Sequence, residues 1–131
     1  MTDPAVPPTD SATSSTIATS TAPLPPEHPV ERQLAAYNAH DLDAFVASYS
    51  PDVRLINGDG TVRAEGLEQF RAAYVPVFAQ VGRRAEIVSR IAIGNWVIDH
   101  ERVHRADAEP FDALVGYRLV DGEIVEAHMF D

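Results

Sequence analysis

The second half of the chain contains four long segments with strand character and no helical pattern. These segments, residues 85–93, 96–105, 111–120 and 123–130, are rich in β-branched and aromatic residues. Gly94-Asn95 and Asp121-Gly122 are typical two-residue turns between antiparallel strands. Strands joined in succession by short turns form a meander, and strands of this length must curl. The region therefore predicts a strongly curved antiparallel sheet.

The preceding residues predict three helices and one hairpin. Pro29 suits a first helical turn, and apolar residues then recur with helical spacing to residue 37. Asp41 can cap a second helix over residues 42–46, and a third covers 66–78. Short strands at 53–56 and 61–63 flank the turn Asn57-Gly58-Asp59-Gly60. The predicted order is ααββαββββ, an α+β fold in which three N-terminal helices cover one face of a cone-shaped sheet with mixed edges and enclose a pocket.

Residues 1–27 differ from the rest in composition. They are rich in Pro, Ser, Thr and Ala and contain neither aromatic nor basic residues. Such a segment cannot bury enough apolar surface to offset the entropy lost on ordering. We predict a disordered tail over residues 1–27 and a folded domain over residues 28–131.

The overall charge and the missing residue types exclude several classes of function. The formal net charge of −10 repels phosphate, so we expect no nucleic-acid partner and no anionic membrane partner. Cysteine and lysine are both absent, which excludes thiolate sites and Schiff-base chemistry. No apolar run reaches the length of a membrane span and no secretory signal is visible, so a cytoplasmic location is expected.

Four motifs carry a resemblance to a known superfamily. They are Y-N-A-H-D-L-D-A-F (37–45), Y-S-P-D-V (49–53), G-L-E-Q-F-R-A-A-Y (66–74) and V-D-G-E-I-V-E (120–126). With the order of elements, they make residues 28–131 resemble the nuclear transport factor 2-like superfamily, which includes ketosteroid isomerases and SnoaL-like proteins. The resemblance implies the cone-shaped fold, but this fold hosts many activities.

The same resemblance argues against two known mechanisms. Steroid isomerases use a tyrosine, an aspartate base and a protonated aspartic acid, and these positions fall at Gln33, Asn57 and Val115. The strand aspartate of SnoaL-like cyclases falls at Met129. An amide cannot take up a proton as aspartate does, and valine donates no hydrogen bond. We therefore expect neither classical steroid isomerisation nor the cyclase mechanism.

The side chains that face the pocket depend on strand alternation. A two-residue Gly94-Asn95 turn pairs Ser89 with His100 and places His100 and Arg102 toward the helices. A loop one residue longer would place Asp99, Glu101 and Val103 there instead.

The last hairpin leaves the same choice. A two-residue turn puts His128 on the face of Tyr117, whereas a glycine bulge puts Val125, Ala127 and Met129 there. The family pattern favours the second, with His128 at the surface or in a dimer interface.

These considerations give a set of candidate site residues. His100 is the candidate catalytic acid or base, because a histidine pKa lies near working pH. The candidate pocket-lining residues are Tyr37, Asn57, Tyr74, Arg102 and Tyr117. Each has a structural alternative: the tyrosines can be core residues, Asn57 can serve its turn, and Arg102 can pair with a carboxylate.

Two functional hypotheses remain open. The first is a protein that binds a small apolar or aromatic molecule in its pocket. The second is an isomerase-, cyclase- or hydrolase-type enzyme acting on a small apolar carbonyl compound through His100. We expect no cofactor and no metal, because His100 and His104 would lie about 13 Å apart on one strand. We also expect a homodimer, since Val88, Leu114 and Val120 would otherwise expose apolar surface.

Overall fold

A computed structural model describes residues 24–130 and confirms the predicted α+β class and order of elements. The elements are α1 (Pro29–Asn38), α2 (Leu42–Ala47), β1 (Tyr49–Asn57), β2 (Val62–Glu65), α3 (Gly66–Phe78), β3 (Arg84–Ile93), β4 (Trp96–Arg105), β5 (Ala108–Val120) and β6 (Glu123–Phe130). The predicted tail at residues 1–23 lies outside the described residues. Leu24 packs against the core, so the described fold starts before the predicted boundary at residue 28.

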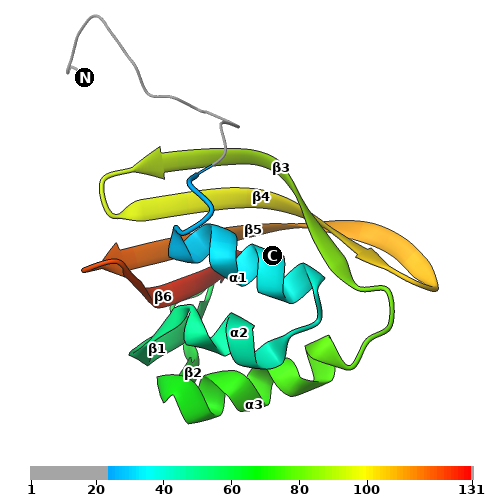
Figure 1. The fold of residues 1–131 in the computed structure, drawn as a ribbon, viewed down its shortest axis with the longest axis horizontal. Helices are drawn as coiled ribbons and strands as arrows, with labels where there is room; N and C mark the ends of the chain where they lie inside the picture. The colour runs from blue at the N-terminus through cyan, green and yellow to red at the C-terminus, as the bar shows by residue number, and fades with distance from the viewer. Residues whose placement is uncertain (1–23, 131) are drawn as a thin grey trace, which may run out of the picture.

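The sheet has six strands in the order β2-β1-β6-β5-β4-β3. β1 and β6 run parallel, and every other neighbouring pair is antiparallel. Figure 1 shows the long strands curving around α1, with α2 and α3 beside β1 and β2. We call the concave side of the sheet that faces the helices the inner face, and the opposite side the outer face.

Aromatic side chains hold the helices to the inner face. The ring of Phe45 on α2 lies 4.8–5.8 Å, centroid to centroid, from the rings of Tyr49, Phe70, Tyr74 and Phe78. Phe45 is almost fully buried, and stacked or tilted aromatic pairs at such distances add to the stability gained from burial. The longest helix, α3, has 13 residues. Within residues 24–130, no helix combines the length and the apolar character needed to cross a membrane.

A bulge in β3 determines which residues of β4 face inward. The Gly94-Asn95 turn has the predicted length, and Ile93 pairs with Trp96 and Ser89 with His100. The register then shifts between Ile87 and Ser89. Val88 is the extra residue, and such an insertion changes the strand face that the following residues present. Ala85 and Arg90 are therefore both buried, although they are five positions apart and would lie on opposite faces of a regular strand.

The prediction that His100 faces the helices is consequently wrong. On β4 the buried residues are Val97, Asp99, Glu101 and Val103. His100 lies on the outer face, where its Nε2 is 2.8 Å from Asp112 Oδ2. The set Asp99, Glu101 and Val103 that we attached to a longer loop does face inward, but a strand bulge produces it.

A second bulge sets the face of β6. The Asp121-Gly122 turn has two residues, with Val120 paired to Glu123, and the register shifts between Arg118 and Leu119. Ala127 thus pairs with Tyr117, and His128 pairs with Gly116. His128 lies on the outer face beside Trp96 and stacks on Phe130, as the family pattern favoured.

The outer face carries both ion pairs and exposed apolar side chains. Its exposed apolar residues are Ile93, Leu114, Val120 and Phe130. Arg54 and Arg118 both donate to Glu126, and His128 also lies within hydrogen-bonding distance of that carboxylate. The homodimer expected through this face stays a prediction.

Candidate functional site

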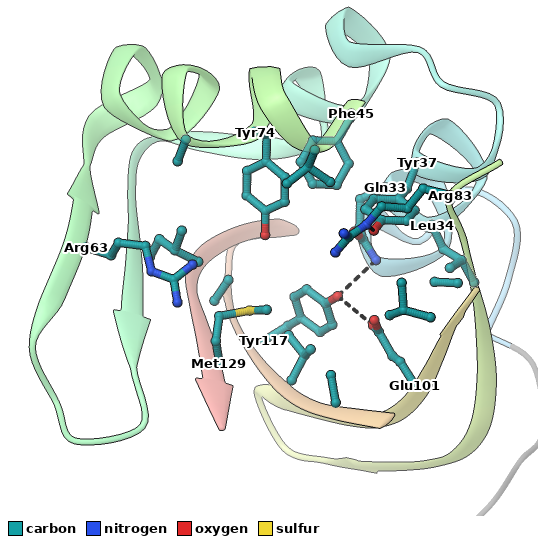
Figure 2. A pocket seen from close by; sticks show the side chains of 18 of the residues that line it. Gln33, Leu34, Tyr37, Phe45, Arg63, Tyr74, Arg83, Glu101, Tyr117 and Met129 are labelled. Atoms are coloured by element: carbon teal, nitrogen blue, oxygen red, sulfur yellow. Dashed lines mark hydrogen bonds between the residues drawn. The ribbon is translucent and has the colours of Figure 1, made fainter. Parts of the chain in front are cut away.

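A cavity of about 160 Å³ lies between the helices and the inner face of the sheet. Figure 2 shows its polar and apolar side chains. Most of its wall is apolar or aromatic, including Leu34, Phe45, Leu55, Ala73, Val77, Ala85, Val103, Phe111, Ala113, Val115, Ala127 and Met129. Its polar lining residues are Gln33, Tyr37, Arg63, Tyr74, Arg83, Glu101 and Tyr117. An apolar enclosure with a few convergent polar groups is typical of small-molecule sites.

The structure brings together only part of the predicted site. Tyr37, Tyr74 and Tyr117 line the cavity, whereas Asn57, His100 and Arg102 do not. The Asn57 side chain stabilises the β1–β2 hairpin. Its Nδ2 donates to Thr61 Oγ1 at 2.9 Å, and its Oδ1 accepts from Arg63 Nε at 3.0 Å. Placing it in the pocket was wrong because its side chain is used by the hairpin.

Arg102 also lies outside the cavity. It is on the same outer face as His100, and its Nε and Nη2 donate to the Asp112 carboxylate at 2.9 and 3.3 Å. The bulge at Val88 explains this placement too, because Arg102 and His100 have the same parity on β4. The Asp112 carboxylate joins both side chains at the surface.

A chain of four hydrogen-bonded side chains crosses the wall of the cavity. Tyr49 OH donates to Gln33 Oε1 at 3.0 Å, and Gln33 Nε2 lies 3.2 Å from Tyr117 OH, to which it donates. Tyr117 OH in turn donates to Glu101 Oε2 at 3.1 Å. Because Gln33 is on α1, Tyr49 on β1, Tyr117 on β5 and Glu101 on β4, the chain links four elements and ends at the glutamate.

Glu101 is the carboxyl group in the wall of the cavity. Burial in the apolar surroundings raises its pKa to about 7, and the nearby Asp99 charge adds to this effect. The hydrogen bond from Tyr117 and the charge of Arg90 act in the opposite direction. Within residues 24–130, Glu101 Oε1 makes no hydrogen bond, so this oxygen is available to a molecule in the cavity.

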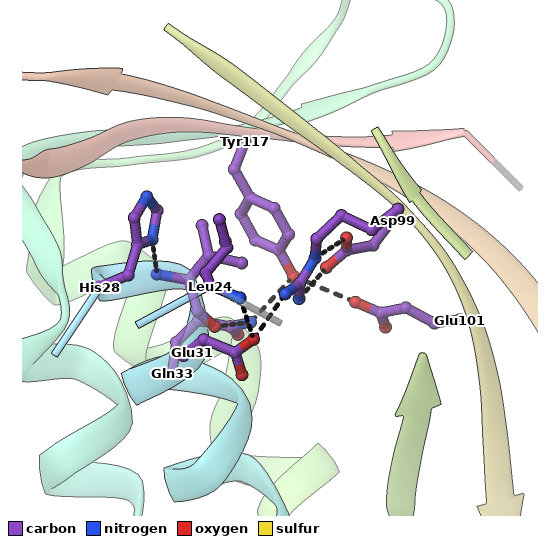
Figure 3. Close-up of polar contacts among 9 residues, drawn as sticks. Leu24, His28, Glu31, Gln33, Asp99, Glu101 and Tyr117 are labelled. Carbon is purple, nitrogen blue, oxygen red and sulfur yellow. Dashed lines mark hydrogen bonds and ion pairs between the residues drawn. The ribbon is translucent and has the colours of Figure 1, made fainter. Parts of the chain in front are cut away.

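A buried ion-pair triad supports the strand that carries Glu101. Arg90 donates to both oxygens of Asp99, at 2.6 and 2.9 Å, and to Glu31 Oε2 at 2.6 Å. Asp99 is completely buried and Arg90 is 4% exposed. Figure 3 shows Glu31 and Asp99 of this triad beside the Tyr117–Glu101 contact. The triad ties α1 to β3 and β4 and places a negative charge two residues from Glu101.

Two further tyrosines contribute hydroxyls. Tyr37 OH accepts from Arg83 Nε at 2.6 Å. The hydroxyl of Tyr74 points from α3 into the cavity (Figure 2) and makes no side-chain hydrogen bond among residues 24–130. Burial raises the pKa of both phenols, so both stay protonated and can donate hydrogen bonds.

These groups define the chemistry available in the cavity. Glu101 can exchange a proton near neutral pH, and Tyr74 can donate a hydrogen bond to an oxygen that gains negative charge. No group of three or more His, Asp or Glu side chains within residues 24–130 is arranged to hold a metal ion.

Comparison with known families decides the classification. A family model for the SnoaL-like domain matches residues 30–127. The chain belongs to this family. The matched residues cover the helices, the cavity and most of the sheet. No curated protein matches the sequence.

Solved structures agree with this assignment of the SnoaL-like domain. An uncharacterised cystatin-fold protein from Novosphingobium aromaticivorans is 27% identical, with a TM-score of 0.72 over 83% of this chain and 100% of the other. An NTF2-like protein of unknown function from Cytophaga hutchinsonii is 17% identical, with a TM-score of 0.66 over 84% and 92%. An LEH-like epoxide hydrolase from M. tuberculosis is 19% identical, with a TM-score of 0.64 over 78% of each chain. The latter two show the fold alone.

Sequence reasoning missed four polar lining residues of this SnoaL-like domain, namely Gln33, Arg63, Arg83 and Glu101. Glu101 was set aside with the face assigned to a longer loop, and Arg83 lies between two predicted elements. Gln33 replaces the isomerase tyrosine according to the resemblance, yet it occupies the cavity wall and bonds two tyrosines. Glu101 lies on the same face of its strand as the apolar residues Val97 and Val103. This alternation was the available indication that its carboxylate is buried.

Proposed function

We propose that this SnoaL-like domain binds a small, mainly apolar carbonyl compound in its cavity and moves a proton of that compound through Glu101. The observation that carries the proposal is a buried carboxyl group, with a pKa of about 7, in the wall of a small cavity lined by both apolar and polar side chains. A catalytic base works best when its pKa lies near the operating pH. Buried carboxylates without a functional reason are rare, because ionising them costs stability.

The size of the cavity limits the compound. A cavity of about 150 Å³ accommodates benzene, so a volume of about 160 Å³ fits a body of one six-membered ring. A steroid skeleton with four fused rings is too large for it. The proposed ligands therefore contain one ring and are smaller than the steroid substrates of the isomerases that this chain resembles.

The proposed step is proton transfer next to a carbonyl group. Glu101 Oε1 takes a proton from the carbon beside the carbonyl, so that a C–H bond breaks and an O–H bond forms. The electron pair of the C–H bond forms a C=C bond while the π pair of the carbonyl moves to its oxygen, giving an enolate that Tyr74 OH stabilises by donating a hydrogen bond. Exchange is completed when solvent replaces the proton on Glu101 and the new proton or deuteron is delivered to the same carbon, and delivery to another carbon of a conjugated enolate completes isomerisation.

Hydrogen–deuterium exchange tests this proposal. Cyclohexanone is incubated with the protein in D₂O, and loss of its α-proton signal is followed by ¹H NMR. We expect exchange faster than in protein-free buffer at the same pH, with a protein-dependent rate that rises as the pH passes through about 7, because only ionised Glu101 is a base.

The outcome also separates the two functional hypotheses. Binding of cyclohexanone, seen as shifts in the amide spectrum, without accelerated exchange would support a non-catalytic binding domain. Exchange that is no faster than in buffer, together with no shifts, would contradict both the proton transfer and the ligand assignment.

A further inference from the structure

We propose that the ligand of this cavity is a carboxylate carried on a body of about one ring, and that Arg83 is the anchor for its carboxylate group, with Arg63 as a second cation. This inference rests on the proposed function, because it names the class of ligand for the same cavity. The resemblance to steroid isomerases and cyclases suggests no anionic ligand. The argument depends on how the two arginines are placed and partnered.

Arg83 is half-buried in the cavity wall and held in place by neutral groups. Its Nε donates to Tyr37 OH at 2.6 Å and its Nη1 donates to Gln80 Oε1 at 2.9 Å. Its guanidinium carbon lies 5.6 Å from the centre of the Phe111 ring. Within residues 24–130, Nη2 donates to no protein group. The guanidinium is therefore oriented by its surroundings while part of its donor set is unused.

Arg63 reaches the same cavity from β2. Figure 2 shows the side chains of Arg63 and Arg83 entering from opposite sides of the space below Tyr74. The Nε of Arg63 donates to Asn57 Oδ1 at 3.0 Å, which again is a neutral partner. Two cations therefore line one small cavity.

The other inward-facing arginine of the described chain is neutralised. Arg90 has both Asp99 and Glu31 as partners, whereas no carboxylate of residues 24–130 lies within ion-pair distance of Arg63 or Arg83. The folded chain is strongly acidic, so carboxylates are plentiful. A half-buried guanidinium with unused donors and without a carboxylate partner is suited to an external carboxylate, which it can bind through two parallel hydrogen bonds.

The rest of the wall fits an aromatic or cyclic body. Phe45, Tyr74 and Phe111 present ring surfaces, and Met129 adds a polarisable sulfur, which contacts rings favourably. The volume of about 160 Å³ suits one ring. A planar ring with a carboxylate therefore matches both the apolar wall and the arginines.

Paired ligands of equal shape test the inference. Benzoate and its neutral analogue benzamide are titrated into ¹⁵N-labelled protein, and dissociation constants are obtained from amide shifts. We expect benzoate to bind more tightly than benzamide. Arg83→Gln is expected to weaken benzoate binding about tenfold or more, because a charged hydrogen bond is lost, and to change benzamide binding less than about twofold.

Arg105→Gln is the matched control. Arg105 stacks on the same Phe111 ring, with its guanidinium carbon 4.9 Å from the ring centre, but does not line the cavity. We expect this variant to bind both ligands as the wild type does. Arg63→Gln is expected to weaken benzoate binding less than Arg83→Gln, by about threefold, because Arg63 is exposed.

Each other result decides against the inference. Benzamide binding as tightly as benzoate would overturn it while leaving the proposed function intact. Failure of both ligands to bind would also overturn it, whereas the proposed function is decided separately by the cyclohexanone experiment. If Arg83→Gln weakens both ligands equally, Arg83 does not act as a carboxylate anchor and the inference is overturned.

Discussion

Replacing Glu101 by glutamine is expected to raise the free energy of unfolding at pH 8 and to leave it nearly unchanged near pH 4. The pKa of Glu101 is about 7 in the folded protein, against an ordinary value of 4.5. Between these two values the folded state binds more protons than the unfolded state, so the contribution of Glu101 is fully present below pH 4.5 and is lost as the pH rises through 7. The loss is about 3 kcal/mol, at about 1.4 kcal/mol for each pKa unit.

Urea unfolding of both proteins at pH 4.5, 6 and 8 measures this difference. Groups that titrate alike in the two proteins cancel, and the residues that face Glu101, namely Asp99, Arg90 and Tyr117, are kept. Glutamine can still accept the hydrogen bond from Tyr117. A variant that is less stable than the wild type at pH 8 would show that the ionised carboxylate is well solvated or well paired, against our description.

The same variant is expected to lose proton exchange. Removing the base should lower the exchange rate of cyclohexanone by about 10²- to 10⁴-fold, which is the usual contribution of a positioned acid or base. If Glu101→Gln makes the protein both more stable and inactive, the buried carboxylate lowers stability and serves function.

Glu126→Gln is the control, because its expected change in the free energy of unfolding has the opposite sign. The hydrogen bond from Arg118 is the main cause of the low pKa of Glu126, about 2, and His128 and Arg54 contribute further. Its stabilisation is present above the ordinary pKa of 4.5 and is lost as the pH falls through 2. We expect this variant to lose about 1–2 kcal/mol at pH 6 and at pH 8 alike, and to retain exchange activity.

Replacing Asp99 by asparagine is expected to be the most destabilising of these changes. Asp99 is fully buried and receives two hydrogen bonds from Arg90. Removing one charge of a buried pair leaves the other without full compensation, which costs about 3–5 kcal/mol. Urea unfolding at pH 7 measures the loss. The variant should also lower the pKa of Glu101, since the neighbouring negative charge disappears.

Asp112→Asn is the matched comparison for Asp99→Asn. Asp112 also pairs with an arginine of a neighbouring strand, but on the outer face in contact with water. We expect little change in stability from this variant, because exposed ion pairs contribute little. Equal losses for the two aspartates would contradict the importance assigned to burial of the triad.

Much of the fold could be predicted from local sequence patterns. Helical spacing of apolar residues, Pro29 in a first turn and Asp41 at a helix start are local signals, and each marks an element that the structure contains. The turn pairs Gly94-Asn95 and Asp121-Gly122 gave the correct hairpins. These signals act over a few residues, so one sequence is enough to recognise them.

Of the candidate site, the three tyrosines Tyr37, Tyr74 and Tyr117 could be predicted, but the carboxylate could not, because its position depends on strand faces. Val88 is an ordinary strand residue by type, and nothing in its neighbours marks it as the extra residue of a bulge. One such residue exchanges His100 and Arg102 for Asp99 and Glu101 on the inner face. The pairing of Arg90 with Asp99 and Glu31 brings together three elements, and no local pattern specifies it.

The central claim is that Glu101 titrates near neutral pH inside the cavity. A pH titration by ¹³C NMR of the glutamate side-chain carboxyls, with the Glu101 signal assigned by its disappearance in Glu101→Gln, measures this directly. Our account predicts a midpoint at a pH of about 7 for the ligand-free protein. A midpoint near the ordinary value of 4.5 would contradict it and would remove Glu101 as an acid–base group.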